Sequence, residues 1–327
     1  MAISGIFAIQ NVYHQQLSNS WPVTAYVVPL PAITFGFAVG GVISSTANRL
    51  TFATDTNTVA VRGPLSLARF GFAGTGNSVH GWYAGGLTSP STSRVDRITY
   101  AADTSTASVR GSTFEGQSSY SSTDGSYGWF AGFARNPSPS PDASKIARID
   151  FSNDNIAMLH RGTLIERVDN TSGTGNATHG YVLGGLATFG TISLVQRITY
   201  SDDTATTTTR GPLSIPRYGH GSVQNSTNAW IAGGLTTGSS NRSSIDRMQF
   251  STDTATAVVR SNLSESVSTW IGNGGISDNA VYGWFVGAGN PGMLSTVQRL
   301  SYDNDTSNTS IRGSLAASQY LMAKSSG

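Results

Sequence analysis

The stretch Val195-Gln-Arg-Ile-Thr-Tyr-Ser-Asp-Asp-Thr-Ala-Thr-Thr-Thr-Thr-Arg-Gly211 decides the fold, because five other segments of the chain repeat its plan. Apolar and polar residues alternate from Val195 to Tyr200, as in a β-strand. In every copy an aspartate lies six residues after the first arginine, and a second arginine lies thirteen residues after it. The first arginines are Arg49, Arg97, Arg148, Arg197, Arg247 and Arg299; the aspartates are Asp55, Asp103, Asp154, Asp203, Asp253 and Asp305; the second arginines are Arg62, Arg110, Arg161, Arg210, Arg260 and Arg312. These constant offsets indicate a structural unit of about fifty residues, repeated along the chain.

Each unit also carries an upstream element that combines glycine with an aromatic residue, such as Gly81-Trp-Tyr-Ala-Gly-Gly86. The aromatic residue at its second place is Phe37, Trp82, Trp129, Tyr181, Trp230 or Trp284. A row of aromatic side chains suits sugar stacking, but these residues are flanked by apolar neighbours at one fixed place in the unit. We therefore expect them to pack between neighbouring units.

One unit read as secondary structure gives four strands. The expected strands are His80–Leu87, Arg94–Tyr100 and Ser105–Val109, with the segment Ala101–Thr104 as a turn, and a fourth of the type of Phe70–Gly74 or Tyr218–Val223. Scarce helix formers (three Glu and two Lys) and abundant Thr, Ser, Gly and Val favour strands and turns throughout. Four antiparallel strands repeated six times predict an all-β protein, a six-bladed β-propeller.

The two ends of the repeat indicate how the ring closes. The first unit lacks a strand of the fourth type, whereas Tyr320–Lys324 follows the last unit and matches that type. We expect the C-terminal strand to complete the first blade beside Phe35–Val39, which removes exposed sheet edges. Ala25–Val28 is a competing partner, disfavoured by the prolines around it. The predicted domains are an N-terminal extension at 1–34 and a propeller at 35–327, with units near 36–62, 81–110, 128–161, 180–210, 229–260 and 283–312.

The unit resembles the kelch repeat, in which a glycine pair, a tyrosine, an Asp-Thr turn and a Pro-Leu segment follow in order. The second unit has Gly85-Gly86, Tyr100 and Asp103-Thr104 in that order. The Pro-Leu segment is present in other units, as Gly63-Pro-Leu-Ser-Leu-Ala-Arg69 and Gly211-Pro-Leu-Ser-Ile-Pro-Arg217, and the kelch tryptophan of the outer strand is missing. The units are more similar to the kelch-like repeat proteins of marine bacteriophages, in which Val-Asp-Arg-Ile-x-Tyr, Asp-Thr-Ala-Thr and Arg-Gly-Pro-Leu-Ser recur. This resemblance covers about 35–324.

The phage proteins are counted among virion structural components. The resemblance therefore implies a virion-borne protein in a fibre, decoration or host-attachment role, present as a homo-oligomer or in many copies. The N-terminal extension, with its apolar residues from Ile3 to Leu17, is then expected to contact other virion proteins. The alternative is that it packs against the side of the propeller.

Composition excludes several kinds of chemistry. Without cysteine the chain cannot form disulfides or thiolate metal sites, and its net charge of +2 disfavours a nucleic-acid-coating role. No apolar run is long enough to predict a membrane span, and no basic start predicts a signal peptide. No glycine-rich loop predicts a phosphate-binding cofactor site, so we expect no cofactor.

The titratable residues form no recognisable catalytic set. His80 and His179 precede equivalent strands, His220 lies in a predicted inner strand, and no spacing suggests a nucleophile with its base. We expect the repeated arginines to pair with the turn aspartates or with carbonyls at blade junctions. The Asp303-Asn-Asp305 turn resembles the start of a calcium loop without its later Gly and Glu. The sequence therefore favours a protein that is not an enzyme, with a polysaccharide-degrading propeller enzyme and a kelch-type interaction domain as alternatives.

One face of the propeller is expected to vary. From the glycine pair to the first arginine the distance is 8, 11, 15, 12, 13 and 11 residues in successive units, whereas the turn between the last two strands is constant. We call the face with the longer connections the variable face and the opposite one the constant face. Loops on a rigid scaffold concentrate binding residues, and these loops are polar, as suits contact with a host-surface glycan or a protein. The candidate binding residues are Arg94, Arg135, Asn136, Thr191, Asn241, Arg242 and Asn290.

Overall fold

The computed structural model describes residues 34–41, 44–88, 91–117, 120–133, 142–238, 240–265, 275–277, 281–289, 292–319 and 322–326. They belong to one compact unit that spans 33–327. The predicted N-terminal extension therefore lies outside the described residues, apart from Thr34.

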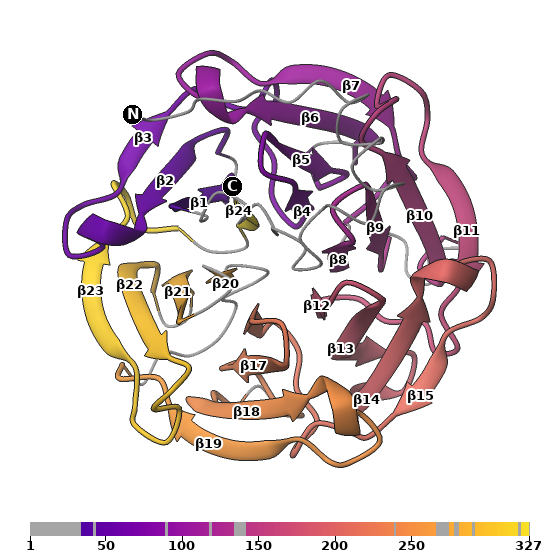
Figure 1. Ribbon diagram of the computed structural model, residues 1–327, viewed down its shortest axis with the longest axis vertical. Coiled ribbons are helices and arrows are strands. Elements are labelled where there is room, and N and C mark those ends of the chain that lie inside the picture. Colours follow the sequence, from indigo (N-terminus) through magenta and orange to yellow (C-terminus); the bar gives the residue numbers. More distant parts are fainter. Residues whose placement is uncertain are drawn as a thin grey trace, which may run out of the picture. The chain divides into compact units, whose positions relative to one another are not determined.

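The described residues form six four-stranded antiparallel sheets, which Figure 1 shows as six blades around a common centre. From the innermost strand outward, blade 1 holds β24 (Ala323–Ser326), β1 (Phe35–Val39), β2 (Ala47–Thr51) and β3 (Ala60–Arg62), and blade 2 holds β4 (Ala73–Gly76), β5 (His80–Ala84), β6 (Arg94–Thr99) and β7 (Ser108–Ser112). Blade 3 holds β8 (Tyr120–Thr123), β9 (Tyr127–Ala131), β10 (Lys145–Asp150) and β11 (Leu159–Thr163), and blade 4 holds β12 (Ser172–Gly175), β13 (His179–Ala187), β14 (Gly190–Thr199) and β15 (Thr208–Arg210). Blade 5 holds β16 (Gly221–Gln224), β17 (Asn228–Ala232), β18 (Ser244–Gln249) and β19 (Val258–Asn262), and blade 6 holds β20 (Gly275–Ser277), β21 (Tyr282–Ala288), β22 (Leu294–Ser301) and β23 (Ser310–Ser314). The predicted six-bladed propeller is confirmed.

The ring closes as the sequence predicts, because the last strand of the chain completes the first blade. β24 pairs antiparallel with β1, and Phe37 lies opposite Ser325. The strand covers 323–326 rather than the expected 320–324, and Tyr320 lies outside the described residues. The competing segment Ala25–Val28 also lies outside them, but β24 already occupies the edge of β1.

Glycines with positive φ angles account for several strand ends that the sequence places differently. Gly71 and Gly219 have φ angles of 61° and 64°, so the chain turns after Phe70 and Tyr218, and β4 and β16 begin later than expected. Gly85, at φ 73°, ends β5 at Ala84 rather than at Leu87. Backbone geometry at single glycines is not visible in hydrophobic periodicity, so these bounds escape prediction.

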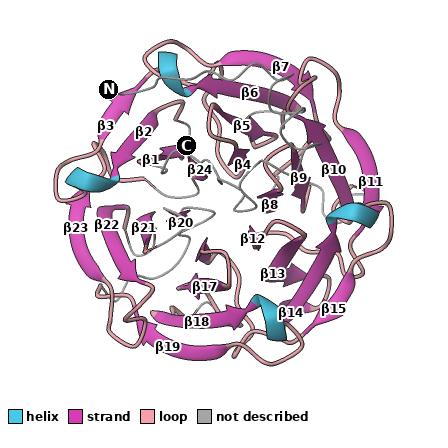
Figure 2. Ribbon diagram, viewed as in Figure 1, coloured by secondary structure: helices cyan, strands magenta, loops and turns pink. Residues whose placement is uncertain are grey.

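The turn between the third and fourth strands is longer than expected. Four of these turns begin with a short 3₁₀ helix, seen in cyan in Figure 2, at Phe52–Thr54, Tyr100–Ala102, Tyr200–Asp202 and Phe250–Thr252. As a result Tyr100 leaves its strand, and β7 starts at Ser108 instead of Ser105. Within the described ranges no helix is long and apolar enough to cross a membrane.

The core lies at the junctions between blades. Trp82 of blade 2 stacks on Phe151 of blade 3, with ring centroids 4.0 Å apart and planes at 5°. The same stacking joins Trp129 to Tyr200, Tyr181 to Phe250, Trp230 to Tyr302, Trp284 to Phe52 and Phe37 to Tyr100. The six second-place aromatics are buried, so the expectation that they pack between blades is confirmed.

Candidate functional site

The same arrangement of charges recurs at all six blade junctions. The two repeated arginines of each blade pair with the repeated aspartate of the following blade; Arg148 and Arg161, for example, lie 3.0 and 2.8 Å from Asp203. The other aspartates pair in the same way, Asp103 with Arg49 and Arg62, Asp154 with Arg97 and Arg110, Asp253 with Arg197 and Arg210, Asp305 with Arg247 and Arg260, and Asp55 with Arg299 and Arg312. The predicted pairing is present, and it runs between blades, including across the closure from blade 6 to blade 1.

A third donor completes five of these junctions. Trp129 Nε1 donates to Asp203 at 2.9 Å, and Tyr181 Oη donates to Asp253 at 3.0 Å. Trp82, Trp230 and Trp284 donate to Asp154, Asp305 and Asp55 at 2.8 Å each. The sixth aromatic is Phe37, which has no donor. At five junctions the repeated aromatic thus contributes both to the packing and to the hydrogen bonding.

The junction also rules out the calcium-loop interpretation of Asp303-Asn-Asp305. Burial acts to raise the pKa of Asp305, but hydrogen bonds from Arg260 and Trp230 and the charge of Arg247 lower it below its ordinary value overall. Because the Asp305 carboxylate already accepts from these three side chains, it serves the scaffold and is not available as a cation ligand.

Two buried ion pairs lie in blades 2 and 5, where sequence reasoning did not expect them. Arg69 lies 2.6 Å from Asp96, and Arg217 lies 2.9 Å from Asp246; all four side chains are fully buried. Both arginines are in the links from an outer strand to the next blade, and each aspartate is the third residue of the third strand of its blade. Arg217 also donates to the carbonyls of Gly233 and Ser244 at 3.1 and 3.0 Å. Each ion pair thus joins the link to the third strand of the next blade, beneath the variable face.

A sequence signal for these pairs does exist. In blade 1 the two equivalent positions hold Gln319 and Asn48, which are joined by a hydrogen bond of 3.3 Å. In blades 1, 2 and 5 arginine thus occurs together with aspartate and glutamine together with asparagine, whereas blade 3 holds Gln117 and Ala147 at these positions. A comparison of the two positions across the repeats finds this pattern, whereas the search for constant residues passes over it.

The candidate binding residues are spread over several blades. Arg94 of blade 2 donates to Ser66 Oγ at 3.0 Å and so supports a link between blades. Thr191 of blade 4 lies in β14 opposite Leu186, and is half-buried. Asn241 and Arg242 are adjacent and exposed in the β17–β18 connection of blade 5, with the Arg242 backbone N–H donating to Gly234. Arg135, Asn136 and Asn290 lie outside the described residues.

Three histidines of the described ranges occupy structural positions. His80 and His179 begin β5 and β13 as hairpin residues, and the backbone N–H of each donates to the side-chain oxygen of an asparagine, Asn77 or Asn176. His220 is fully buried just before β16. Burial lowers the pKa of His220 to about 3, and the charges of Arg217 and Lys324 act in the same direction. His220 is therefore neutral at neutral pH and poorly suited to accept a proton.

The exposed apolar residue that sequence reasoning missed is Phe189. β13 and β14 form one long hairpin in which Ala187 pairs with Gly190, so Thr188 and Phe189 make its apex. The Phe189 side chain is fully exposed there. Arg167, in the link from blade 3, donates to Thr188 Oγ1 at 3.3 Å, and Ile165 of that link is exposed as well. Arg167, Thr188 and Phe189 are together called the Phe189 patch.

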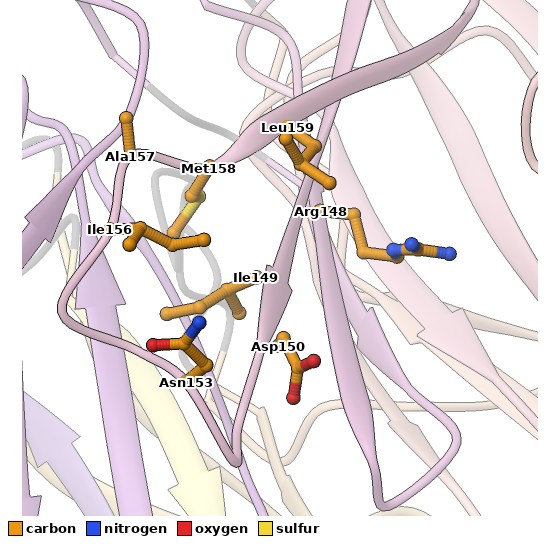
Figure 3. Close-up of a pocket in the computed structure, with 8 residues that line it drawn as sticks. All are labelled: Arg148, Ile149, Asp150, Asn153, Ile156, Ala157, Met158 and Leu159. Carbon is orange, nitrogen blue, oxygen red and sulfur yellow. The ribbon is translucent and has the colours of Figure 1, made fainter.

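A small pocket lies elsewhere, between β10, β11 and the turn that joins them in blade 3 (Figure 3). Its two charged groups already have partners. Arg148 donates to Asp203 at 3.0 Å, and Asp150 accepts from the Ser152 hydroxyl at 2.6 Å. This hydrogen bond lowers the pKa of Asp150. The pocket is part of the constant turn, and we do not take it as the site.

In the part of the chain that the structure describes, no three His, Asp or Glu side chains come together where they could hold a metal ion. Comparison with protein-family models gives no match, and comparison with curated proteins gives none either. The variable face, with the Phe189 patch, is thus the candidate site that the geometry supports best.

Proposed function

We propose that this protein binds a partner through its variable face and has no catalytic role. The observation that carries the proposal is Phe189, a large apolar side chain fully exposed at the apex of a hairpin. Two-residue hairpins favour Asn, Asp or Gly at their apex, so neither the turn nor the core accounts for a phenylalanine there. An exposed aromatic next to a guanidinium and hydroxyls is typical of a contact surface.

The contrast between the faces supports this view. Each blade junction is formed by an aspartate and two arginines at the same repeat positions. The connections on the variable face differ in length and in the side chains that hold them, such as an Arg–Asp ion pair in blade 5 and a Gln–Asn hydrogen bond in blade 1. A constant scaffold with variable loops is the arrangement of proteins that recognise a partner through loops.

We further propose that the partner is a host-surface glycan or protein and that the chain is a component of a phage particle, in a fibre, decoration or attachment role. Its similarity to kelch-like phage repeats supports this proposal, with the N-terminal extension as the attachment to other virion proteins. Immunogold labelling of purified particles tests the location. Label on the particle supports it, and particles without the protein contradict it.

Binding is tested with the labelled protein and a panel of bacterial surface polysaccharides and cells. We expect Phe189→Ser to keep the melting temperature of the wild type and to lose binding at least tenfold, the effect of about 1.4 kcal/mol. Ile156→Ser is the matched control, because Ile156 is an exposed apolar residue in a turn of the constant face. Equal binding by both variants contradicts the assignment of the face, and release of reducing ends from a polysaccharide contradicts the absence of catalysis.

A further inference from the structure

Lys324 lies in β24, the innermost strand of blade 1 and the last strand of the chain. Its Nζ atom lies 2.5 Å from the Ser222 carbonyl oxygen, 3.3 Å from Ser222 Oγ and 3.4 Å from the Gly173 carbonyl oxygen. Gly173 belongs to β12 of blade 4 and Ser222 to β16 of blade 5. In a ring of six, blade 4 is opposite blade 1, as Figure 1 shows, so the side chain reaches across the centre.

The oxygens around Nζ are those of neutral groups. β12 and β16 are inner edge strands, and the edge of a sheet presents carbonyls that need a donor from elsewhere. The Ser222 hydroxyl, itself buried, donates to the Gly173 carbonyl at 2.7 Å, which fixes these acceptors relative to one another. Three oxygens held in this way offer partial negative charge to a cation.

In the described ranges Lys324 forms no ion pair with a carboxylate. Its charge acts on the buried His220, whose pKa it lowers. Burial lowers the pKa of Lys324 to about 7. Lys324 is therefore charged in mildly acidic solution, and its charge is balanced by oxygen dipoles alone.

We propose that the centre of the ring is a binding site for a small ammonium-type cation, formed by the Ser222 and Gly173 oxygens, and that the chain fills it with the side chain of Lys324. The ammonium then ties the closing strand to the opposite side of the ring. Neither the repeat pattern nor the pairing of β24 with β1 requires such a contact.

The test removes the tethered ammonium and offers a free one, at about pH 6, where the amine is charged. We expect Lys324→Ala to melt at a lower temperature than the wild type, and methylammonium to raise its melting temperature by about 2 °C or more. Tetramethylammonium, which has no N–H donor, should not do so at equal ionic strength. In Lys324→Met the thioether stem still fills the space, so methylammonium should have little effect on this control. An equal response to the two ions, or an equal response of the two variants, overturns the proposal.

A measurement on the wild type decides the matter if Lys324→Ala does not fold. The chain has two lysines, so ¹⁵N-labelled lysine gives two side-chain Nζ signals, and Lys145→Ala assigns them. Lys145 pairs with Asp142 at 2.7 Å in a partly exposed position. We expect the Lys324 ammonium protons to exchange with water much more slowly than those of Lys145 at about pH 6. Equally fast exchange, or a neutral Lys324 amine at that pH, overturns the proposal.

Discussion

Replacing Asp154 with alanine should destabilise the propeller more than replacing Asp103, although the two aspartates occupy equivalent junctions. Asp103 lies 2.7 and 3.3 Å from two arginines of blade 1, and Asp154 lies 2.9 and 3.7 Å from two arginines of blade 2. Asp154 also accepts a hydrogen bond from Trp82 at 2.8 Å. The equivalent aromatic facing Asp103 is Phe37, which offers no donor.

The size of the difference follows from this third donor. The arginine side chains are about a fifth exposed, so each ion pair contributes about 0.2–1 kcal/mol after screening by water. Asp103→Ala should therefore cost about 0.5–2 kcal/mol. Asp154→Ala leaves the buried Trp82 N–H without an acceptor, which costs about 1–3 kcal/mol more.

The assay is urea denaturation of both variants, with Asp202→Ala as the control because Asp202 is exposed and next to a junction aspartate. Adding Trp82→Phe to Asp154→Ala removes the unpaired N–H and should recover part of the loss. Equal free energies of unfolding for Asp103→Ala and Asp154→Ala would refute the reasoning, as would a further loss in the double variant.

Two further predictions concern buried charge. Arg217→Leu leaves Asp246 buried without its partner and should lower the free energy of unfolding by about 3–5 kcal/mol in urea denaturation. Arg217→Gln combined with Asp246→Asn copies the pair of blade 1 and should recover most of that lost stability. An unchanged free energy of unfolding for Arg217→Leu contradicts the account. His220, whose pKa burial lowers to about 3, stays neutral in the folded protein while the unfolded chain takes up a proton below about pH 6.5. The free energy of unfolding should therefore fall as the pH drops from about 6.5 toward 3, and His220→Leu should flatten that part of the pH profile; an unchanged profile contradicts it.

Repetition explains why so much of the fold is visible in the sequence. Six copies of an arginine and an aspartate at fixed offsets define the blade, and the unmatched ends of the repeat predict the pairing of β24 with β1. The strand ends are less visible, because the positive φ angles at Gly71 and Gly85 interrupt segments that read as continuous. The sequence predicts that each repeated arginine pairs with a repeated aspartate, but it does not predict which aspartate, because a spacing within one blade does not say which blade supplies it.

The candidate site depends on features that do not repeat, so the sequence predicts it less well. Loop length favours the variable face as the candidate site, but it does not distinguish a residue that hydrogen-bonds to a link, such as Arg94, from one exposed at an apex, such as Phe189. The buried pair of Arg217 and Asp246 involves residues far apart in one repeat. The constant spacings of the repeat give no reason to pair them, and the sequence signals the contact only through the joint variation of the two positions among blades 1, 2 and 5.

Closure of the ring by the C-terminal strand is tested most directly with a pair of engineered cysteines. The chain has no cysteine of its own, so Val39→Cys and Ala323→Cys, which replace residues facing each other in β1 and β24, can form one disulfide within the molecule. Mild oxidation should link the two residues in the folded protein, and peptide mapping should recover 39 and 323 in one cross-linked fragment. Two free thiols after oxidation of the folded protein, or links only between molecules, would contradict a propeller whose last strand completes its first blade.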